Sequence, residues 1–316
     1  MDFSRRTAIA VDLGATNVRV ALVLSSGKII SKISEPTAKS GKSGIIVTKQ
    51  IVRMIRATRN AHPSKIKGIG ISSIGPLDYK RGGPIRSPNV PFAFIPLVGP
   101  LRRAFRLSIS LFNDCNAAVL GERAFGAGKN KCNIVYITLS TGIGGGVIAD
   151  GKLLLGKSGN AAEVGHFNVS GDVSDLPCSC GKGTNHWEGY ASGKNIPRFF
   201  RFWLRQQGKK ETRSAPTAVG TLRAEDIFRL AHHGNPAAKK FLDALAHINA
   251  RAISNIIVAY DPEIITIGGS VALRNPSVIL NGIKKYVDRY LPTPPIAITK
   301  PGEDITLLGA VADFFQ

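Results

Sequence analysis

The sequence of 316 residues is poor in cysteine and in acidic residues, and it lacks a long apolar segment. Its four cysteines are too few for a disulfide scaffold in a chain of this length, which favours a reducing compartment. No uncharged apolar run reaches the roughly 18 residues that a membrane span requires. Residues 1–6 lead directly into a strand-like segment, without the apolar core and cleavage site of a secretory signal. We therefore expect a cytoplasmic protein that does not bind membranes.

Acidic residues number only 21, against 42 lysines and arginines, so the formal net charge is +21. An excess of this size favours a polyanionic ligand, which is either a nucleic acid or a nucleotide. The densest basic stretch, residues 198–213, holds six basic residues and one acidic residue. A solvated helix and the loop after it explain that stretch better than a binding surface does. The charge alone therefore does not choose between the two ligands.

The pattern of apolar runs occurs twice. Three runs separated by short turns predict a three-strand meander within residues 7–34, and the same order of strand, glycine turn, strand, hairpin and strand returns within residues 133–155. The repeat predicts two similar α/β halves that face each other across a cleft. Further predicted elements are the helices 45–61, 114–125, 196–207, 224–233 and 236–260, the strands 66–72, 108–112 and 264–268, a polar loop at 212–221, and a final strand and helix within 305–316.

The first turn of each meander has the composition of a phosphate-binding loop. In the first, Gly14 allows a ligand to approach the backbone, and backbone N–H groups together with the Thr16 hydroxyl can bind phosphate oxygens. Asp12 can hold Mg²⁺ through water. Taken alone, this turn is better explained as an ordinary hairpin. The second turn, residues 140–146, contains four glycines and two hydroxyls. A nucleotide phosphate chain bound between the two halves explains both turns, although neither is a Walker motif.

A carboxylate follows the strand at 108–112. Asp114 opens the next helix, so it is either part of an N-cap or a general base that projects into the cleft. Asn113, beside it, supplies the donor and acceptor that a sugar hydroxyl requires.

Two cysteines and two histidines form a further cluster. His166, Cys178, Cys180 and His186 provide the ligand types of a Cys₂His₂ zinc site, although their spacing is not that of a zinc finger. The alternative is two reduced loop cysteines beside unrelated histidines.

These landmarks, taken together and in this order, resemble the sugar kinases of the ROK (repressor, open reading frame, kinase) family in the actin-like ATPase superfamily. The resemblance covers nearly the whole chain. It rests on the segments 12–17 (DLGATN), 68–78 (GIGISSIGPLD), 87–89 (SPN), 113–118 (NDCNAA), 140–146 (STGIGGG), 163–166 (EVGH) and 267–269 (IGG).

The resemblance implies a role for each landmark. Asp114 is the expected catalytic base. The residues expected to bind the sugar hydroxyls are Asn89, Asn113, Asp114, Glu163, His166 and Glu188. ATP and Mg²⁺ are the expected cofactors, and the nucleotide-binding residues are Asp12, Gly14, Ala15, Thr16, Asn17, Thr141, Gly142, Gly144, Gly145, Gly268 and Gly269, of which Asp12 holds Mg²⁺ through water. The expected fold is α/β with two ribonuclease H-like domains, 1–113 plus 305–316 and 114–304.

The metal-binding segment departs from the family pattern. The family has Cys-x-Cys-Gly-x-x-Gly-Cys-x-Glu, whereas residues 178–188 are one residue longer and place His186 where the family has its last cysteine. Because His is also a zinc ligand, we expect one structural Zn²⁺ on His166, Cys178, Cys180 and His186.

The resemblance predicts an ATP-dependent kinase that phosphorylates the 6-hydroxyl of a hexose, with glucose as the first candidate. The alternatives are N-acetylmannosamine or another N-acetylhexosamine, and fructose. A sugar-sensing transcriptional regulator is the competing class. Such regulators carry a helix-turn-helix domain ahead of the core, and the first turn here begins at residue 12, so we expect neither that domain nor a nucleic-acid partner. Related kinases imply a homodimer or homotetramer.

Overall fold

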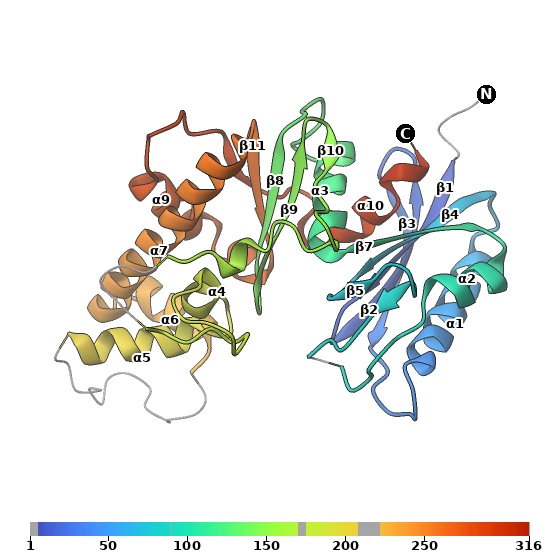
Figure 1. Cartoon of the computed structure of the whole chain (residues 1–316), viewed down its shortest axis with the longest axis horizontal. Coiled ribbons are helices and arrows are strands. Elements are labelled where there is room, and N and C mark those ends of the chain that lie inside the picture. Colours follow the sequence, from blue (N-terminus) through green and yellow to red (C-terminus); the bar gives the residue numbers. More distant parts are fainter. Residues whose placement is uncertain (1–5, 89, 170–174, 208–221, 316) are drawn as a thin grey trace. The chain divides into compact units, whose positions relative to one another are not determined.

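The computed structural model describes residues 6–88, 90–169, 175–207 and 222–315 of the chain (Figure 1). These divide into two compact units. The first unit comprises residues 1–131, 153–161 and 304–316, and the second comprises residues 132–152 and 162–303.

The first unit is built on a five-stranded sheet with the order β3-β2-β1-β4-β7. Strand β1 (Thr7–Leu13) pairs antiparallel with β2 (Asn17–Leu24), which pairs antiparallel with β3 (Ile29–Pro36). On its other side β1 pairs parallel with β4 (Ile66–Ser73), and β4 pairs parallel with β7 (Ser108–Asn113). Every residue of β1 is buried, as expected of a central strand covered on both faces.

Alternation along β1 separates the two faces of this sheet. Ile9 and Val11 belong to a core cluster that includes residues of α1 (Ile45–Ala61) and α2 (Val98–Phe105). Ala8 belongs to the opposite cluster, with residues of α10 (Ile305–Ala310). The small alanine allows α10 to lie close to the sheet.

Helix α3 (Asp114–Phe125) belongs to the first unit. It packs against α10, and the glycines Gly121 and Gly309 allow the two backbones to approach, because a Cβ on Gly309 would overlap the carbonyl of Ala117. The N-terminal segment of this unit therefore continues past the expected boundary at 113/114, to residue 131.

The second unit repeats the sheet of the first, with the order β10-β9-β8-β11-β12. Strand β8 (Ile134–Leu139) pairs antiparallel with β9 (Ile143–Ala149) and parallel with β11 (Ile264–Gly268). The sheet ends in β10 (Lys152–Leu153) and β12 (Ile296–Ile298). The equal strand order confirms the duplicated α/β arrangement.

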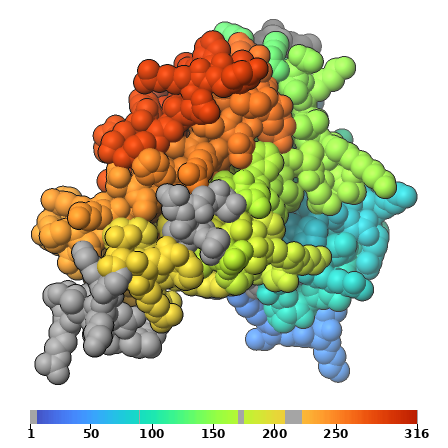
Figure 2. All heavy atoms as spheres, turned by 60° about the vertical axis from the view of Figure 1, so that its left-hand side comes forward, coloured from blue at the N-terminus to red at the C-terminus, as the bar shows by residue number. Residues whose placement is uncertain are grey.

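Helices of the second unit pack around an aromatic core. The Phe241 ring has edge contacts with the rings of Phe199, Phe200 and Trp203, and Trp187 Nε1 donates to Asn249 Oδ1 at 2.8 Å. In Figure 2 the yellow atoms of α5 lie beside the orange atoms of α6 and α7. The helices are α4 (Trp187–Ala191), α5 (Ile196–Gln206), α6 (Ala224–His232), α7 (Pro236–Tyr260), α8 (Ser270–Arg274) and α9 (Pro276–Tyr286).

Most predicted elements are confirmed, but the final strand is not where it was expected. The last strand is β12, and the segment expected to hold a strand contains α10 and then η4 (Ala312–Phe314). The predicted loop at 212–221 lies outside the described residues. Shorter elements are β5 (Leu77–Asp78), β6 (Gly83–Pro84), η2 (Val164–His166) and η3 (Gly302–Asp304). Within the described ranges, no helix has the length and apolar character needed to cross a bilayer.

Candidate active site

The first glycine turn connects β1 to β2. Gly14 N donates to Asn17 O at 2.9 Å, and a Cβ on Gly14 would lie 2.9 Å from that same oxygen, so the turn requires glycine there. Thr37 fixes the turn from β3's side, since its hydroxyl donates to Gly14 O at 2.8 Å and its N–H to Thr16 O. The turn is therefore rigid, with Thr16 and Asn17 exposed at its tip.

Asp12 is held by two neighbouring strands. Both Nε and Nη2 of Arg19 donate to Asp12 Oδ2, at 3.0 and 2.7 Å, and the Ser72 hydroxyl donates to Oδ1 at 2.7 Å. Arg19 also contacts Asp304 and Thr306 in the C-terminal segment of the unit. The carboxylate thus has a fixed orientation, and its remaining lone pairs can accept from Mg²⁺-bound water.

Asn113 and Asp114 lie where β7 ends and α3 begins. The Asn113 side chain caps the helix by accepting from Cys115 N at 3.0 Å, and Asp114 Oδ1 accepts from the same N–H at 2.8 Å. A carboxylate at a helix N-terminus is favoured in its charged form. Both side chains are half-buried, so the capping role and the role of a base are compatible.

The second glycine turn is shorter than the sequence indicated. It consists of residues 140–142, where Ser140 N donates to Gly142 O at 2.9 Å, and β9 begins at Ile143. Gly144 and Gly145 therefore lie in β9, paired with residues of β8. A Cβ on Gly145 would lie 2.8 Å from Val164 Cγ2, so this glycine serves the packing of β9 against η2.

Gly268 and Gly269 lie beside that turn. Gly268 ends β11, and Gly269 has a φ of +84°, which directs the chain into α8. A Cβ on Gly269 would overlap the carbonyl of Leu139, so the two glycines bring α8 against the end of β8.

A pocket of about 430 Å³ opens in the second unit next to these glycines. It is lined by Thr141 from the turn, Ser270 and Val271 from α8, and residues of α5 and α6. Its dimensions and its mixture of apolar and polar groups are those of a small-ligand site.

Three predicted sugar-binding residues of the second unit lie together near η2 and α4. Glu188 accepts from Ile143 N at 3.0 Å through Oε2 and from the Ser179 hydroxyl at 3.3 Å through Oε1. Glu163 is exposed, but neighbouring groups exclude enough water from its carboxyl to raise the pKa, and the charge of Glu188 raises that pKa further. Asn89 lies outside the described residues.

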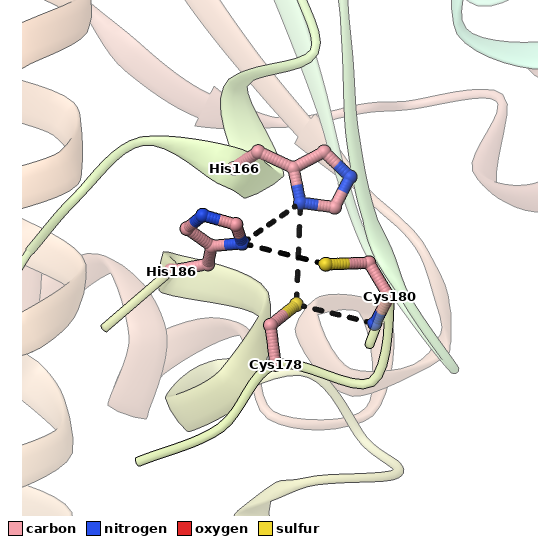
Figure 3. Close-up of side chains that lie close together, drawn as sticks. All are labelled: His166, Cys178, Cys180 and His186. Atoms are coloured by element: carbon pink, nitrogen blue, oxygen red, sulfur yellow. Dashed lines mark hydrogen bonds between the residues drawn. The ribbon is translucent and has the colours of Figure 1, made fainter. Parts of the chain in front are cut away.

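Figure 3 shows the four predicted metal ligands pointing toward one another. All four ligand atoms lie within 4.8 Å of one another. His166 Nδ1 is 3.3 Å from His186 Nδ1 and 4.0 Å from Cys178 Sγ, and Cys180 Sγ is 3.6 Å from His186 Nδ1.

Two of these separations, the 3.3 Å between the two nitrogens and the 3.6 Å between Cys180 Sγ and His186 Nδ1, match the edges of a tetrahedral zinc site, whereas the 4.0 Å between His166 Nδ1 and Cys178 Sγ is longer. Zinc bonds of about 2.0–2.1 Å to nitrogen and about 2.3 Å to sulfur place two nitrogens about 3.3 Å apart and a nitrogen and a sulfur about 3.6 Å apart. Burial raises the pKa of the Cys178 thiol to about 11, and burial also lowers the pKa of His186, which keeps its imidazole neutral for metal binding. The four residues therefore fit Zn²⁺, and all four cysteines of the chain are free of disulfides.

The structure adds site residues that sequence reasoning missed. Arg19 orients Asp12, and its signal was a charged residue between Val18 and Val20 in an otherwise apolar strand. Lys194 and Phe228 line the pocket, but neither stands in a pattern that marks it in the sequence.

Two units with the same sheet order, each with a glycine turn between its first two strands, define a protein of the two-domain actin-like ATPase fold. The ROK family model matches residues 8–315. The chain therefore belongs to the ROK family.

Individual relatives cover the chain almost completely. A glucokinase from Pyrobaculum calidifontis is 34% identical over 306 residues, 96% of this chain and 93% of that protein. The crystal structure of a ROK family glucokinase from Streptomyces griseus in complex with glucose and AMPPNP has a TM-score of 0.75 at 28% identity, and the match covers 97% of this chain and 98% of that one. A xylose repressor from Caldicellulosiruptor bescii is 26% identical over 270 residues, 84% of this chain and 66% of the repressor.

Proposed function

We propose that the protein is an ATP-dependent hexose kinase that transfers the γ-phosphoryl group to the 6-hydroxyl of glucose, with Asp114 as the general base. The observation that carries this proposal is the match to a glucokinase over 96% of the chain, with a carboxylate at the junction of β7 and α3. The glucokinase with glucose and AMPPNP, a nucleoside triphosphate analogue, supports the same pair of substrates.

Asp114 accepts the proton of the sugar's 6-hydroxyl as that oxygen attacks the γ-phosphorus. The bond from the γ-phosphorus to the oxygen shared with the β-phosphate breaks, and ADP leaves. The Cys115 N–H orients the carboxylate at the N-terminus of α3, where the helix dipole is favourable for a negative charge.

The two glycine turns bind the phosphates. Backbone N–H groups of residues 15–17 and 141–142, with the hydroxyls of Thr16 and Thr141, donate to phosphate oxygens. Mg²⁺, when bound, neutralises charge on the phosphoryl oxygens. Asp12 holds it through water, and Arg19 and Ser72 fix the orientation of Asp12. Gly144, Gly145, Gly268 and Gly269 act by shaping β9 and α8 around the second turn.

The sugar hydroxyls bind to Asn89, Asn113, Glu163, His166 and Glu188. Glu188 has a second task, because its carboxylate also joins Ile143 N at the end of the glycine turn to Ser179 in the metal loop. Specificity among glucose, N-acetylmannosamine and fructose depends on where these side chains lie relative to the sugar.

One structural Zn²⁺ is held by His166, Cys178, Cys180 and His186. Two thiolates and two imidazoles complete its coordination, so it takes no part in phosphoryl transfer. It would fix the segment between η2 and α4, which Glu163, just before η2, and Glu188, in α4, flank.

A panel of sugars in an ADP-release assay tests the proposed activity. We expect glucose to give the highest kcat/KM, with N-acetylmannosamine and fructose as the comparison substrates. Absence of sugar-dependent ADP release, together with sequence-specific binding of duplex DNA, would favour a sugar-sensing regulator like the xylose repressor relative instead. Light scattering in the same buffer tests the homodimer or homotetramer.

A further inference from the structure

The pocket beside the second glycine turn contains charged groups that the mechanism above does not use. Its lining includes Lys194, Arg223, Glu225 and Arg274, and its other walls are largely apolar. Three cations and one carboxylate give this pocket a net positive charge. A cation that is already paired with a carboxylate is less available to a ligand than one that is not, so we compare the partners of these side chains.

Both arginines are engaged by the single carboxylate. Arg274 forms a hydrogen-bonded ion pair with Glu225, and Arg223 Nη2 lies 3.7 Å from the same carboxylate. Arg223 also lies 3.9 Å from Asp226. The two arginines and the two carboxylates therefore neutralise one another at the rim of the pocket, where α6 begins and α8 ends.

Lys194 is the remaining cation of the pocket. It is exposed, and within the part of the chain that the structure describes its ammonium group has no carboxylate within ion-pair distance. Its backbone is fixed against the glycine turn, because Gly193 N donates to Ser140 O at 2.7 Å and Lys194 N to Thr141 O at 3.4 Å. The side chain therefore starts from a rigid point directly beside the proposed phosphate-binding residues.

The apolar side of the pocket fits a nucleobase. Phe228 is 7% exposed and Val271 is 7% exposed, and Pro197 is buried as well. The hydroxyls of Ser140 and Ser270, 3.2 Å apart, lie on the side of the glycine turn. The pocket thus has an apolar wall on α5, α6 and α8, and a polar end at the glycine turn with Lys194.

We propose that Lys194 binds the β- and γ-phosphates of the nucleotide, while the wall around Phe228 takes the base. The proposal rests on the proposed kinase function, since it deepens the nucleotide site of that reaction. Lysine binds phosphate as a compact charge with three donors, and among the described residues no carboxylate occupies the Lys194 ammonium group before the nucleotide enters. Lys194 is thereby a substrate-binding residue of this chain that the family landmarks do not include.

A ladder of nucleotides tests this assignment in the full-length protein. Dissociation constants for adenosine, AMP, ADP and ATP are measured by calorimetry on the wild type and on Lys194→Ala, Lys194→Arg, Phe228→Ala and Lys240→Ala. Lys194→Ala should weaken ATP and ADP about tenfold and change AMP and adenosine less than about twofold, because a charged hydrogen bond to the outer phosphates is lost.

The other three variants are controls for the series of four ligands. Lys194→Arg should retain most of the ATP affinity, because the charge remains. Phe228→Ala should weaken all four ligands by a similar factor, because they share the base. Lys240→Ala, an exposed lysine on α7 outside the pocket, should change none of them.

Each result decides the proposal. Unchanged ATP affinity in Lys194→Ala, or an equal loss for all four ligands, overturns the assignment of Lys194. A wild type that binds none of the four overturns both this proposal and the kinase. A wild type that shows the expected ladder but phosphorylates no sugar in the panel overturns the kinase alone.

Discussion

Two carboxylates of the first unit, Asp12 and Asp114, are oriented by hydrogen bonds that leave some of their oxygen lone pairs available for the proposed chemistry. Asp114 accepts from a helix N–H and keeps lone pairs for a proton, while Asp12 is bound by Arg19 and Ser72 and keeps lone pairs for water. At this scale the proposed chemistry depends both on the identity of each carboxylate and on the hydrogen bonds that orient it.

Asp114→Asn should lower kcat by about a hundredfold or more, with the KM values for ATP and glucose changed less than about threefold. Asparagine keeps the shape and the bond from Cys115 N but cannot accept the proton. Steady-state kinetics check this expectation, with Asp150→Asn in the exposed β9–β10 turn as the matched control. Turnover near the wild-type rate would show that another group is the base.

At the scale of helices and strands, close backbone contacts and one segment of the second unit determine the positions of the proposed catalytic and sugar-binding side chains. Helix α3 carries Asp114, and its position depends on its packing against α10. Glu163 lies just before η2 and Glu188 lies in α4, so both flank the segment whose position depends on the cysteine and histidine cluster.

Gly309→Ala should destabilise the protein by about 1–3 kcal/mol or more, because the new methyl group would overlap the carbonyl of Ala117 in a buried helix contact. Urea denaturation of the full chain measures this change. Gly99→Ala is the control, since its Cβ would meet only the end of the flexible Arg103 side chain, at 3.6 Å. Equal stability of both variants contradicts the packing argument.

Protein purified without added metal should contain about one Zn²⁺ per chain, and the double variant Cys178→Ser plus Cys180→Ser should contain almost none. Elemental analysis measures both. Active wild-type enzyme without zinc would rule out the metal site and leave the kinase assignment intact.

Metal loading should release protons, and zinc affinity should rise with pH. The metal-free Cys178 thiol has a pKa of about 11, so it is protonated at neutral pH and must lose its proton to bind zinc. Calorimetric titration in buffers of different ionisation enthalpy measures the number released. Zinc affinity that is independent of pH would show that Cys178 is not a ligand.

For the whole molecule, the dominant property is a formal net charge of +21. If the protein is a kinase, this positive charge attracts ATP; if it is a transcriptional regulator, the charge attracts DNA. The two functions predict a different dependence of DNA affinity on DNA sequence. A kinase would contact only phosphates, which carry no sequence information, whereas a regulator would prefer a particular sequence.

Binding to duplex DNA should weaken steeply with salt and should not differ between unrelated sequences. Fluorescence anisotropy with two unrelated duplexes at about 50 and 200 mM salt measures both quantities, with glucose present and absent. A duplex that retains tight binding at the higher salt, in a sugar-dependent way, would instead identify a regulator.

The sequence by itself determined the repeated order of strands and turns, because alternating apolar runs and glycine turns are local properties of the chain. It also determined the motif residues, which occur in family order. The pairing of β8 with β11, more than a hundred residues apart, and the assignment of α3 to the first unit were decided only by tertiary packing, as Gly121 and Gly309 show. The same holds for Arg19 on Asp12 and for Lys194 in the pocket, since contacts between distant segments leave no periodic signal. The short metal-ligand spacings likewise became measurable only once the fold had brought η2 to the loop before α4.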